Sequence, residues 1–251
     1  MTQFPDATRK TGVIGRSLPR VEDEVLLRGA GRFVDDLNLP QQLHMRVVRA
    51  QLAHARLASI DFENARAVPG IVAVWSGKDV RHLPPIDFRD PAAEALKPYR
   101  QPVLAQDVVR YVGEPVAAVF ACDPYTAEDA AALVVVELES LPGLVSATDR
   151  PREFATGLST EAMILRDGYG DLDAAMAGTD QIIELEFGIG RHSGVPLETR
   201  GALARYDSAR DVLELFGAAK VPHRTRDNLA RILGRKPESV HNRRPACKPC
   251  W

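Results

Sequence analysis

The chain has 251 residues, a length that allows one large domain or two small ones. Hydrophobic residues make up 45% and charged residues 26%, which is typical of a folded protein and excludes extensive disorder. The formal net charge of −2 argues against a polyanion-binding protein. Three cysteines are too few for a disulfide framework, and no signal peptide or membrane span is recognisable, so we expect a soluble, cytoplasmic protein.

The first half of the chain is predicted to form a strand-rich α/β unit after an irregular leader of residues 1–20. Leu43, Met45 and Val47 alternate with polar residues, which indicates a half-buried strand. Asp123 favours a helix start, because its carboxylate can accept hydrogen bonds from the first free backbone amides, and the proline after it suits the first helical position. Further strands are expected at residues 57–62, 71–75, 108–112, 116–121 and 134–138, and a long proline-rich loop at residues 84–106.

A second unit is expected after a boundary within residues 140–168. Residues 171–177 are predicted to form a short helix that Gly178 ends. Apolar residues alternate with two glutamates over residues 183–189, which is typical of an amphipathic strand. A hairpin is expected from two strands at residues 202–206 and 212–216.

The last predicted helix is opened by Pro222 and closed by Gly234. The region from Lys220 onward is rich in lysine and arginine, so a nucleic-acid-binding patch is one interpretation of it and a solvated helix face is another. The buried side of the helix is expected to carry Val221, Thr225, Leu229, Ile232 and Leu233.

Six short phrases of the sequence carry a resemblance to a known family. The phrases lie at residues 14–36, which include Gly29-Ala30-Gly31-Arg32-Phe33-Val34-Asp35-Asp36, and at residues 111–117, 127–131, 170–175, 196–201 and 221–226. In this order, they resemble the large subunit of the molybdenum hydroxylases, the family of xanthine dehydrogenase, aldehyde oxidase and aerobic carbon monoxide dehydrogenase. The resemblance covers about residues 14 to 240.

The resemblance implies an α+β fold. A hammerhead-type α/β domain would occupy residues 21–145, and a linker would occupy residues 146–164. The beginning of the first molybdopterin-binding α+β domain would occupy residues 165–240.

The resemblance also implies an oxidoreductase. Such subunits hold a molybdenum ion on a pyranopterin, often the cytosine dinucleotide form in bacteria. They hydroxylate a carbon with water-derived oxygen, or oxidise carbon monoxide. Electrons leave through an iron–sulfur subunit to an FAD subunit, and the full complex is expected to be a homodimer without membrane attachment.

The resemblance stops after Val240, where the family continues with an apolar strand and a glycine-rich loop. Residues 241–251 instead carry three basic residues, two prolines and two cysteines, so we expect an irregular, aberrant tail. A shifted reading frame or an early truncation would explain such a tail. The family's catalytic glutamate would lie beyond the chain end, so no catalytic residue and no metal ligand is assigned. The chain alone is expected to be inactive and not to bind the cofactor.

One position of the family's cofactor site falls within the chain. The family usually has a glutamine two residues before the Pro-His pair, and here Lys220 occupies that position. Glutamine can donate and accept hydrogen bonds, whereas lysine only donates, so Lys220 is a doubtful candidate for cofactor binding. A solvated lysine is the alternative, and for His223 a packing role is the alternative to a ligand.

Other features have both a functional and a structural interpretation. Glu198 and Arg200 could pair at a domain face or form an ordinary exposed ion pair. Residues 113–115 could contact the iron–sulfur partner or form a plain turn. The chain could also be a non-catalytic hammerhead module that docks on iron–sulfur or flavin partners.

The cysteines allow one more hypothesis. Cys247 and Cys250 have the spacing of half a zinc site. Only His241 and Cys122 are candidates to complete it. An accidental spacing is the alternative.

Overall fold

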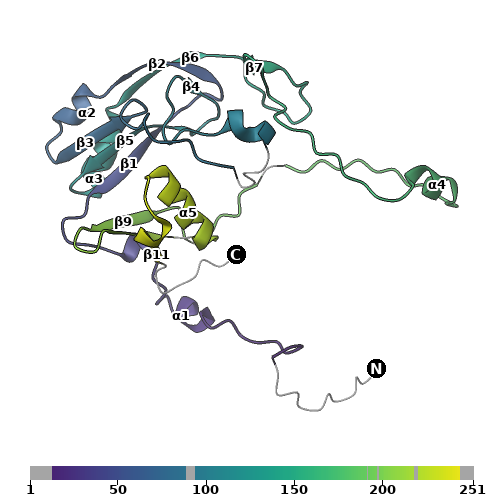
Figure 1. Cartoon of the computed structure of the whole chain (residues 1–251), viewed down its shortest axis with the longest axis horizontal. Helices are drawn as coiled ribbons and strands as arrows, with labels where there is room; N and C mark the ends of the chain where they lie inside the picture. Colours follow the sequence, from purple (N-terminus) through teal and green to yellow (C-terminus); the bar gives the residue numbers. More distant parts are fainter. Residues whose placement is uncertain (1–12, 89–93, 191, 197, 218–219, 244–251) are drawn as a thin grey trace. The chain divides into compact units, whose positions relative to one another are not determined.

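The computed structural model describes residues 13–88, 94–190, 192–196, 198–217 and 220–243 (Figure 1). The chain divides into two compact units. The smaller unit combines residues 1–38, 195–225 and 238–251, and the larger unit combines residues 39–194 and 226–237. No helix in the described ranges is long and apolar enough to cross a bilayer.

The core of the larger unit is built around strand β5 (Pro115–Ala121). It lies between β1 (His44–Arg49) and β3 (Ile71–Ser76), and both neighbours run antiparallel to it. Most of β5 is buried because its valines and alanines pack on both faces of the sheet. The strand predicted around Met45 is present, but Leu43 and Met45 are exposed and Val47 and Val48 are half-buried, so the predicted alternation is wrong.

A second antiparallel sheet of the larger unit has β2 (Ala55–Asp61) in the middle. Its neighbours are β4 (Val108–Val109) and β6 (Val135–Ser140). The strand predicted at residues 108–112 is therefore shorter than expected. Val109 is completely buried and contributes to a cluster of small apolar residues between the sheets.

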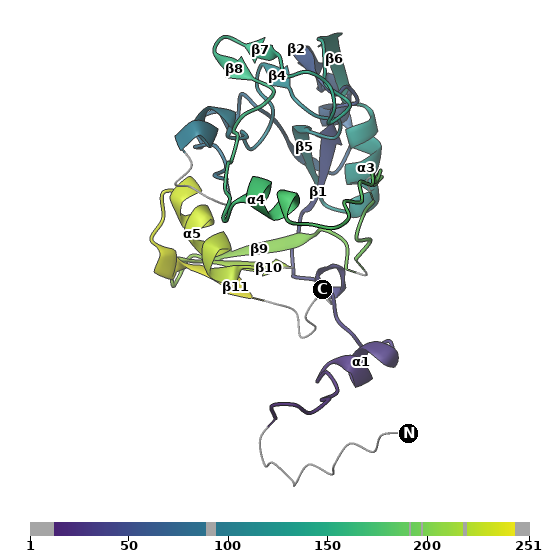
Figure 2. The ribbon, with the colours of Figure 1, turned by 90° about the vertical axis from the view of Figure 1, so that its right-hand side faces the viewer.

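Two helices of the larger unit pack on its first sheet, α2 (Glu63–Ala67) and α3 (Pro124–Ala132), both labelled in Figure 1. Figure 2 shows α3 beside β1. The predicted helix start is confirmed, because the Asp123 carboxylate accepts hydrogen bonds from the backbone amides of Tyr125 at 3.0 Å and Thr126 at 2.9 Å. Hydrogen bonding with Thr126, through its side chain first and then its amide, holds the pKa of Asp123 below its ordinary value, and the bond from the Tyr125 amide adds to this. Alanines of both helices face the buried valines of the sheet.

The proline-rich loop at residues 84–106 contains a 3₁₀ helix, Glu94–Tyr99, and an isolated bridge between Ile86 and Gln101. A small hairpin of β7 (Glu153–Ala155) and β8 (Leu158–Ser159) follows the second sheet.

The predicted helix before Gly178 is present as α4 (Leu172–Ala177). The Asp171 carboxylate begins it by accepting a hydrogen bond from the amide of Ala174 at 2.9 Å. The helix ends at the residue before Gly178, as predicted from the sequence.

The predicted strand at residues 183–189 is wrong. This segment has no regular structure, and Ile183, Leu185, Phe187 and Ile189 are all exposed, Phe187 by 78%. A strand needs a neighbour for its backbone hydrogen bonds. In the described part of the chain no strand pairs with this segment.

The smaller unit contains a three-stranded sheet. Strands β9 (Ala202–Asp207) and β10 (Val212–Gly217) form the predicted antiparallel hairpin. Strand β11 (Val240–Arg243) lies on the other side of β10 and runs parallel to it. The unit also holds the short helix α1 (Asp23–Leu27) and a 3₁₀ turn at Val34–Asp36.

Strand β11 corrects the expectation that the chain is irregular after Val240. Residues 241–243 pair with β10, with His241 opposite Glu214 and Arg243 opposite Phe216. Backbone pairing does not require apolar side chains, and an ion pair of Arg243 adds to it. Residues 244–251, which include Cys247 and Cys250, lie outside the described residues.

The last helix, α5 (Pro222–Ile232), begins at the predicted proline. Gly234 follows its end with a φ of +61°, a left-handed conformation that favours glycine. Thr225, Leu229 and Ile232 are partly buried as predicted, whereas Val221 and Leu233 are exposed.

Candidate functional site

The sequence-predicted residues do not converge on one site. Lys220 is exposed and lies two residues before α5, and His223 is the second, also exposed, residue of that helix. Glu198 does not pair with Arg200, and it is buried instead of exposed. Both interpretations of that pair are therefore wrong, because the Glu198 side chain turns toward the backbone.

Glu198 joins two phrases that lie far apart in the sequence. Its Oε1 accepts a hydrogen bond from the amide of Val34 at 3.2 Å, within the 3₁₀ turn. Gly201 is required here, because a Cβ at this position would lie 2.6 Å from Cγ1 of Val34. The phrase at residues 196–201 thus packs on the phrase that ends at Asp36.

A small acidic cavity lies beside this contact, with a volume of about 110 Å³. The Oε2 atom of Glu198 has no hydrogen-bond partner among the described residues. The carboxylates of Asp35 and Asp36 also line the cavity, so it is negatively charged. The other lining residues are Phe33, Val34 and Thr199.

A second buried carboxylate, Glu114, holds the turn that leads into β5. It is only 1% exposed, and its Oε2 accepts a hydrogen bond from the amide of Arg110. Its Oε1 lies 3.8 Å from Nη2 of Arg110 and has no hydrogen-bond partner in the described part of the chain. Burial therefore raises the pKa of Glu114 above its ordinary value, although the hydrogen bond from Arg110 opposes the change.

The turn that contains Glu114 is also fixed by the backbone of the neighbouring segment. The amide of Ala50 donates to the Glu114 carbonyl at 2.9 Å, and the amide of Gly113 donates to the Ala50 carbonyl at 2.8 Å. Arg49 donates from Nη1 to the Gly113 carbonyl at 2.8 Å. Tyr111 and Val112 are held in exposed positions by this arrangement.

Gly113 and Glu114 therefore lie at the end of the turn between β4 and β5, and Pro115 begins β5. The sequence did not reveal the burial of Glu114, because charged residues are mostly exposed. The signal that could have revealed it is its position between two apolar runs.

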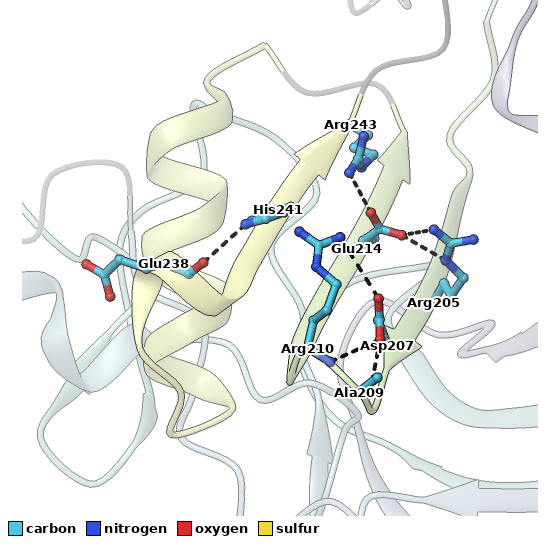
Figure 3. A network of polar contacts seen from close by, with 8 residues as sticks. All are labelled: Arg205, Asp207, Ala209, Arg210, Glu214, Glu238, His241 and Arg243. Carbon is cyan, nitrogen blue, oxygen red and sulfur yellow. Dashed lines mark hydrogen bonds and ion pairs between the residues drawn. The ribbon is translucent and has the colours of Figure 1, made fainter.

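A third buried carboxylate, Glu214, lies at the centre of the small sheet (Figure 3). Arg205 of β9 donates from Nε to Oε2 of Glu214 at 2.7 Å and pairs with the same oxygen through Nη2. Nη2 of Arg243, on β11, lies 2.7 Å from Oε1. Glu214 thus connects all three strands, and its hydrogen bond with Arg205 holds its pKa below the ordinary value despite its burial.

The described residues do not form a metal centre. No three His, Cys, Asp or Glu side chains gather in a way that could hold a metal ion within the described ranges. Cys122 is exposed, and Nε2 of His241 lies 3.2 Å from the Glu238 carbonyl oxygen. The zinc-site hypothesis depends on two cysteines outside the described residues.

Two family models match the chain in succession. One, described as the a/b hammerhead domain of aldehyde oxidase and xanthine dehydrogenase, matches residues 28–142. The other, described as a molybdopterin cofactor-binding domain, matches residues 158–247. Together they cover most of the chain.

Individual proteins agree with these matches. The gamma subunit of the 6-hydroxypseudooxynicotine dehydrogenase complex of Paenarthrobacter nicotinovorans is 40% identical, over 91% of this chain and 30% of that subunit. The carbon monoxide dehydrogenase large chain of Afipia carboxidovorans is 34% identical, over 91% of this chain and 30% of that large chain. The crystal structure of quinoline 2-oxidoreductase from Pseudomonas putida 86 matches with a TM-score of 0.73 and 33% identity, over 92% of this chain and 30% of that one.

The chain belongs to the aldehyde oxidase and xanthine dehydrogenase family of molybdenum hydroxylases. It corresponds to part of the large subunit, with a hammerhead domain followed by the start of a molybdopterin-binding domain. The chain spans about 30% of the length of the relatives it matches.

The described residues of the smaller unit do not by themselves fit the molybdopterin cofactor of this family. The cavity beside Glu198 has about 110 Å³, whereas small-molecule pockets typically have about 300–1,000 Å³. Its three carboxylates would repel the phosphates of a dinucleotide. Lys220 is a single exposed cation, so we assign no reaction step through the cofactor to these residues.

The first prediction concerns Glu114. A raised pKa means that the folded state binds this proton more tightly than the unfolded state does, so the stabilisation is complete below the ordinary pKa of 4.5 and is lost as the pH rises above it. We expect the wild type to lose stability relative to Glu114→Gln as the pH rises from about 4 to about 7. Urea unfolding at several pH values measures this difference.

The matched control is Glu139→Gln, which changes an exposed glutamate that lies 3.8 Å from Arg56. This variant shows what replacing an exposed glutamate does to stability over the same pH range. A difference for Glu114→Gln that changes with pH no more than that for Glu139→Gln would contradict the assignment of a raised pKa.

The second prediction concerns the ion pair between Glu214 and Arg243. Arg243→Ala should lower the melting temperature of the small sheet by about 2–4 °C, because Oε1 of a fully buried carboxylate loses its cation. Arg210→Ala, which removes only an exposed pair at 4.0 Å, should change it much less. Equal effects of the two variants, measured by circular dichroism, would show that Arg243 does not hold β11 in place.

Proposed function

We propose that this chain is the N-terminal part of the molybdopterin-binding large subunit of an oxidoreductase of the molybdenum hydroxylase class. The observation that supports this proposal most strongly is the succession of a hammerhead match over residues 28–142 and a cofactor-domain match over residues 158–247. The activity is hydroxylation with water-derived oxygen or oxidation of carbon monoxide. When bound to the complete subunit, a molybdenum–pterin cofactor, in the cytosine dinucleotide form, supplies the redox chemistry.

In this proposal the residues of the chain provide a scaffold. Glu114 holds the turn that presents Tyr111 and Val112 to solvent, and these exposed apolar side chains suit contact with a partner protein. Glu214 holds the three strands that lie within the cofactor-domain match. The proposed partners are an iron–sulfur subunit and an FAD subunit, in a cytoplasmic complex that forms a homodimer.

The relatives indicate which substrates to test. The names of two of them refer to nicotine-derived compounds, and those of two others refer to quinoline and carbon monoxide. N-heteroaromatic compounds and carbon monoxide are therefore the first substrates to compare in the complete complex.

The third prediction separates a cofactor-loaded subunit from a docking scaffold. The chain purified alone should contain far less than one molybdenum per chain, because its small acidic cavity does not suit the dinucleotide. Co-expressed with the iron–sulfur and FAD subunits of its own source, it should retain the iron–sulfur subunit, detected by the visible absorption of the [2Fe–2S] clusters. Elemental analysis and the absorption spectrum are recorded on the same sample.

The control variant is Val112→Asp, which places a charge on the exposed turn beside Glu114. It should weaken retention of the iron–sulfur subunit, while the same change at an exposed position of β3, Val72→Asp, should not. About one molybdenum per isolated chain would contradict the scaffold role. Failure to retain either partner subunit would contradict the proposed function.

A further inference from the structure

The larger unit has a cavity of about 750 Å³. Its interior has no role in the proposed function, although Tyr111 and Val112 of its lining also belong to the proposed partner contact. Small-molecule sites typically have about 300–1,000 Å³ and are lined mainly by apolar and aromatic side chains with a few polar groups. This cavity has that character, because ring side chains from five separate segments of the chain line it. They are His54, Phe88, Tyr99, Tyr111 and Phe154.

The rings are arranged around Phe154. Its centroid lies 6.1 Å from that of His54, in an edge-to-face arrangement, and 6.1 Å from that of Tyr99, in a tilted one. Aromatic pairs interact favourably at centroid distances of about 4.5–7 Å. A planar aromatic ligand could therefore contact several of these rings at once, and the exposed side chains of Val112 and Val145 extend the apolar lining at its rim.

Several polar groups of the cavity already have partners within the protein. The Gln101 amide donates to the Tyr111 hydroxyl, and the Tyr99 hydroxyl accepts from the amide of Ser159 at 3.1 Å. Nδ1 of His54 lies 2.7 Å from the Pro142 carbonyl oxygen. These contacts fix the shape of the cavity. Because these polar groups are already paired within the protein, the cavity favours a ligand that is mostly apolar.

Arg110 is different, and it is the only permanently charged residue among the described residues that line the cavity. Its Nη2 donates to the Arg100 carbonyl at 3.3 Å and lies 3.8 Å from Oε1 of Glu114. Its Nε and Nη1 atoms have no hydrogen-bond partner in the described part of the chain. A partly buried guanidinium with unused donors favours an anion, above all a carboxylate, which it can bind through two hydrogen bonds.

We propose that this cavity binds a planar aromatic carboxylate, with the carboxylate on Arg110 and the ring among the side chains around Phe154. The site lies in the larger unit, with most of its lining inside the hammerhead match over residues 28–142 and with the rest, including Phe154 and Thr160, after it. Its ligand needs neither molybdenum nor a partner subunit. The isolated full-length chain is therefore sufficient to test it.

The fourth prediction is tested by calorimetric titration of the full-length chain with 2-naphthoate. The neutral isostere 2-naphthamide tests the carboxylate, and cyclohexanecarboxylate tests the aromatic ring. Naphthoate should bind about tenfold more tightly than either of them, because only naphthoate satisfies both parts of the cavity.

A pair of variants at the rim tests the sign of the charge without disturbing the core. Val145 lines the cavity and is 85% exposed, so neither lysine nor glutamate at this position should affect folding. Val145→Lys should strengthen naphthoate binding by about two- to fivefold, and Val145→Glu should weaken it by a similar factor. Arg110→Gln should abolish the preference for naphthoate over naphthamide, with thermal unfolding as the check that this variant is folded.

Three results would overturn the proposal. The first is the absence of naphthoate binding at millimolar concentration. The second is equal affinity for naphthoate and naphthamide in the wild type. The third is a change in the same direction for both Val145 variants.

Discussion

The constraint on which both units depend is the burial of carboxylates, above all Glu114 in the larger unit and Glu214 in the smaller one. Glu114 and Glu214 are both only 1% exposed, and a charge removed from water is costly unless it is paired. The two units meet this cost differently. Glu214 lies between two arginines, so its pKa is held below the ordinary value, whereas Glu114 has one distant guanidinium and burial raises its pKa.

These two carboxylates fix the position of neighbouring structure in each unit. Glu114 fixes the turn before β5, and through it the exposed Tyr111 and the position of Arg110 at the aromatic cavity. Glu214 connects β9, β10 and β11, so the last described strand is held by a side chain as well as by its backbone. The third buried carboxylate, Glu198, joins the N-terminal 3₁₀ turn to the start of the small sheet.

Local patterns in the sequence correctly predicted the helices and strands whose hydrogen-bond partners are close to them in the sequence. The helix start at Asp123 is confirmed because its capping bonds span three residues, and the hairpin of β9 and β10 is confirmed because its strands are adjacent in sequence. The prediction of a strand at residues 183–189 is wrong, because the alternation of apolar and polar residues does not show whether a neighbouring strand is present to pair with this segment. Strand β11 was missed because its residues after Val240 are polar, so no apolar alternation marks a strand that pairs with β10 through its backbone and carries the ion pair of Arg243 with Glu214. For the site, the sequence indicated the family and Lys220, but burial of glutamates cannot be read from composition.

The central claim is that each unit is organised by its own buried glutamate. Hydrogen–deuterium exchange of the full-length wild type, Glu114→Ala and Glu214→Ala tests it most directly. Glu114→Ala should accelerate exchange in β1 and β5, because it leaves the partly buried amide of Arg110 unpaired at a cost of about 1–3 kcal/mol. It should leave β9 to β11 unchanged. Glu214→Ala should accelerate exchange in β9 to β11 and leave β1 and β5 unchanged. Acceleration of both sheets by either variant, or of neither sheet, would contradict the account.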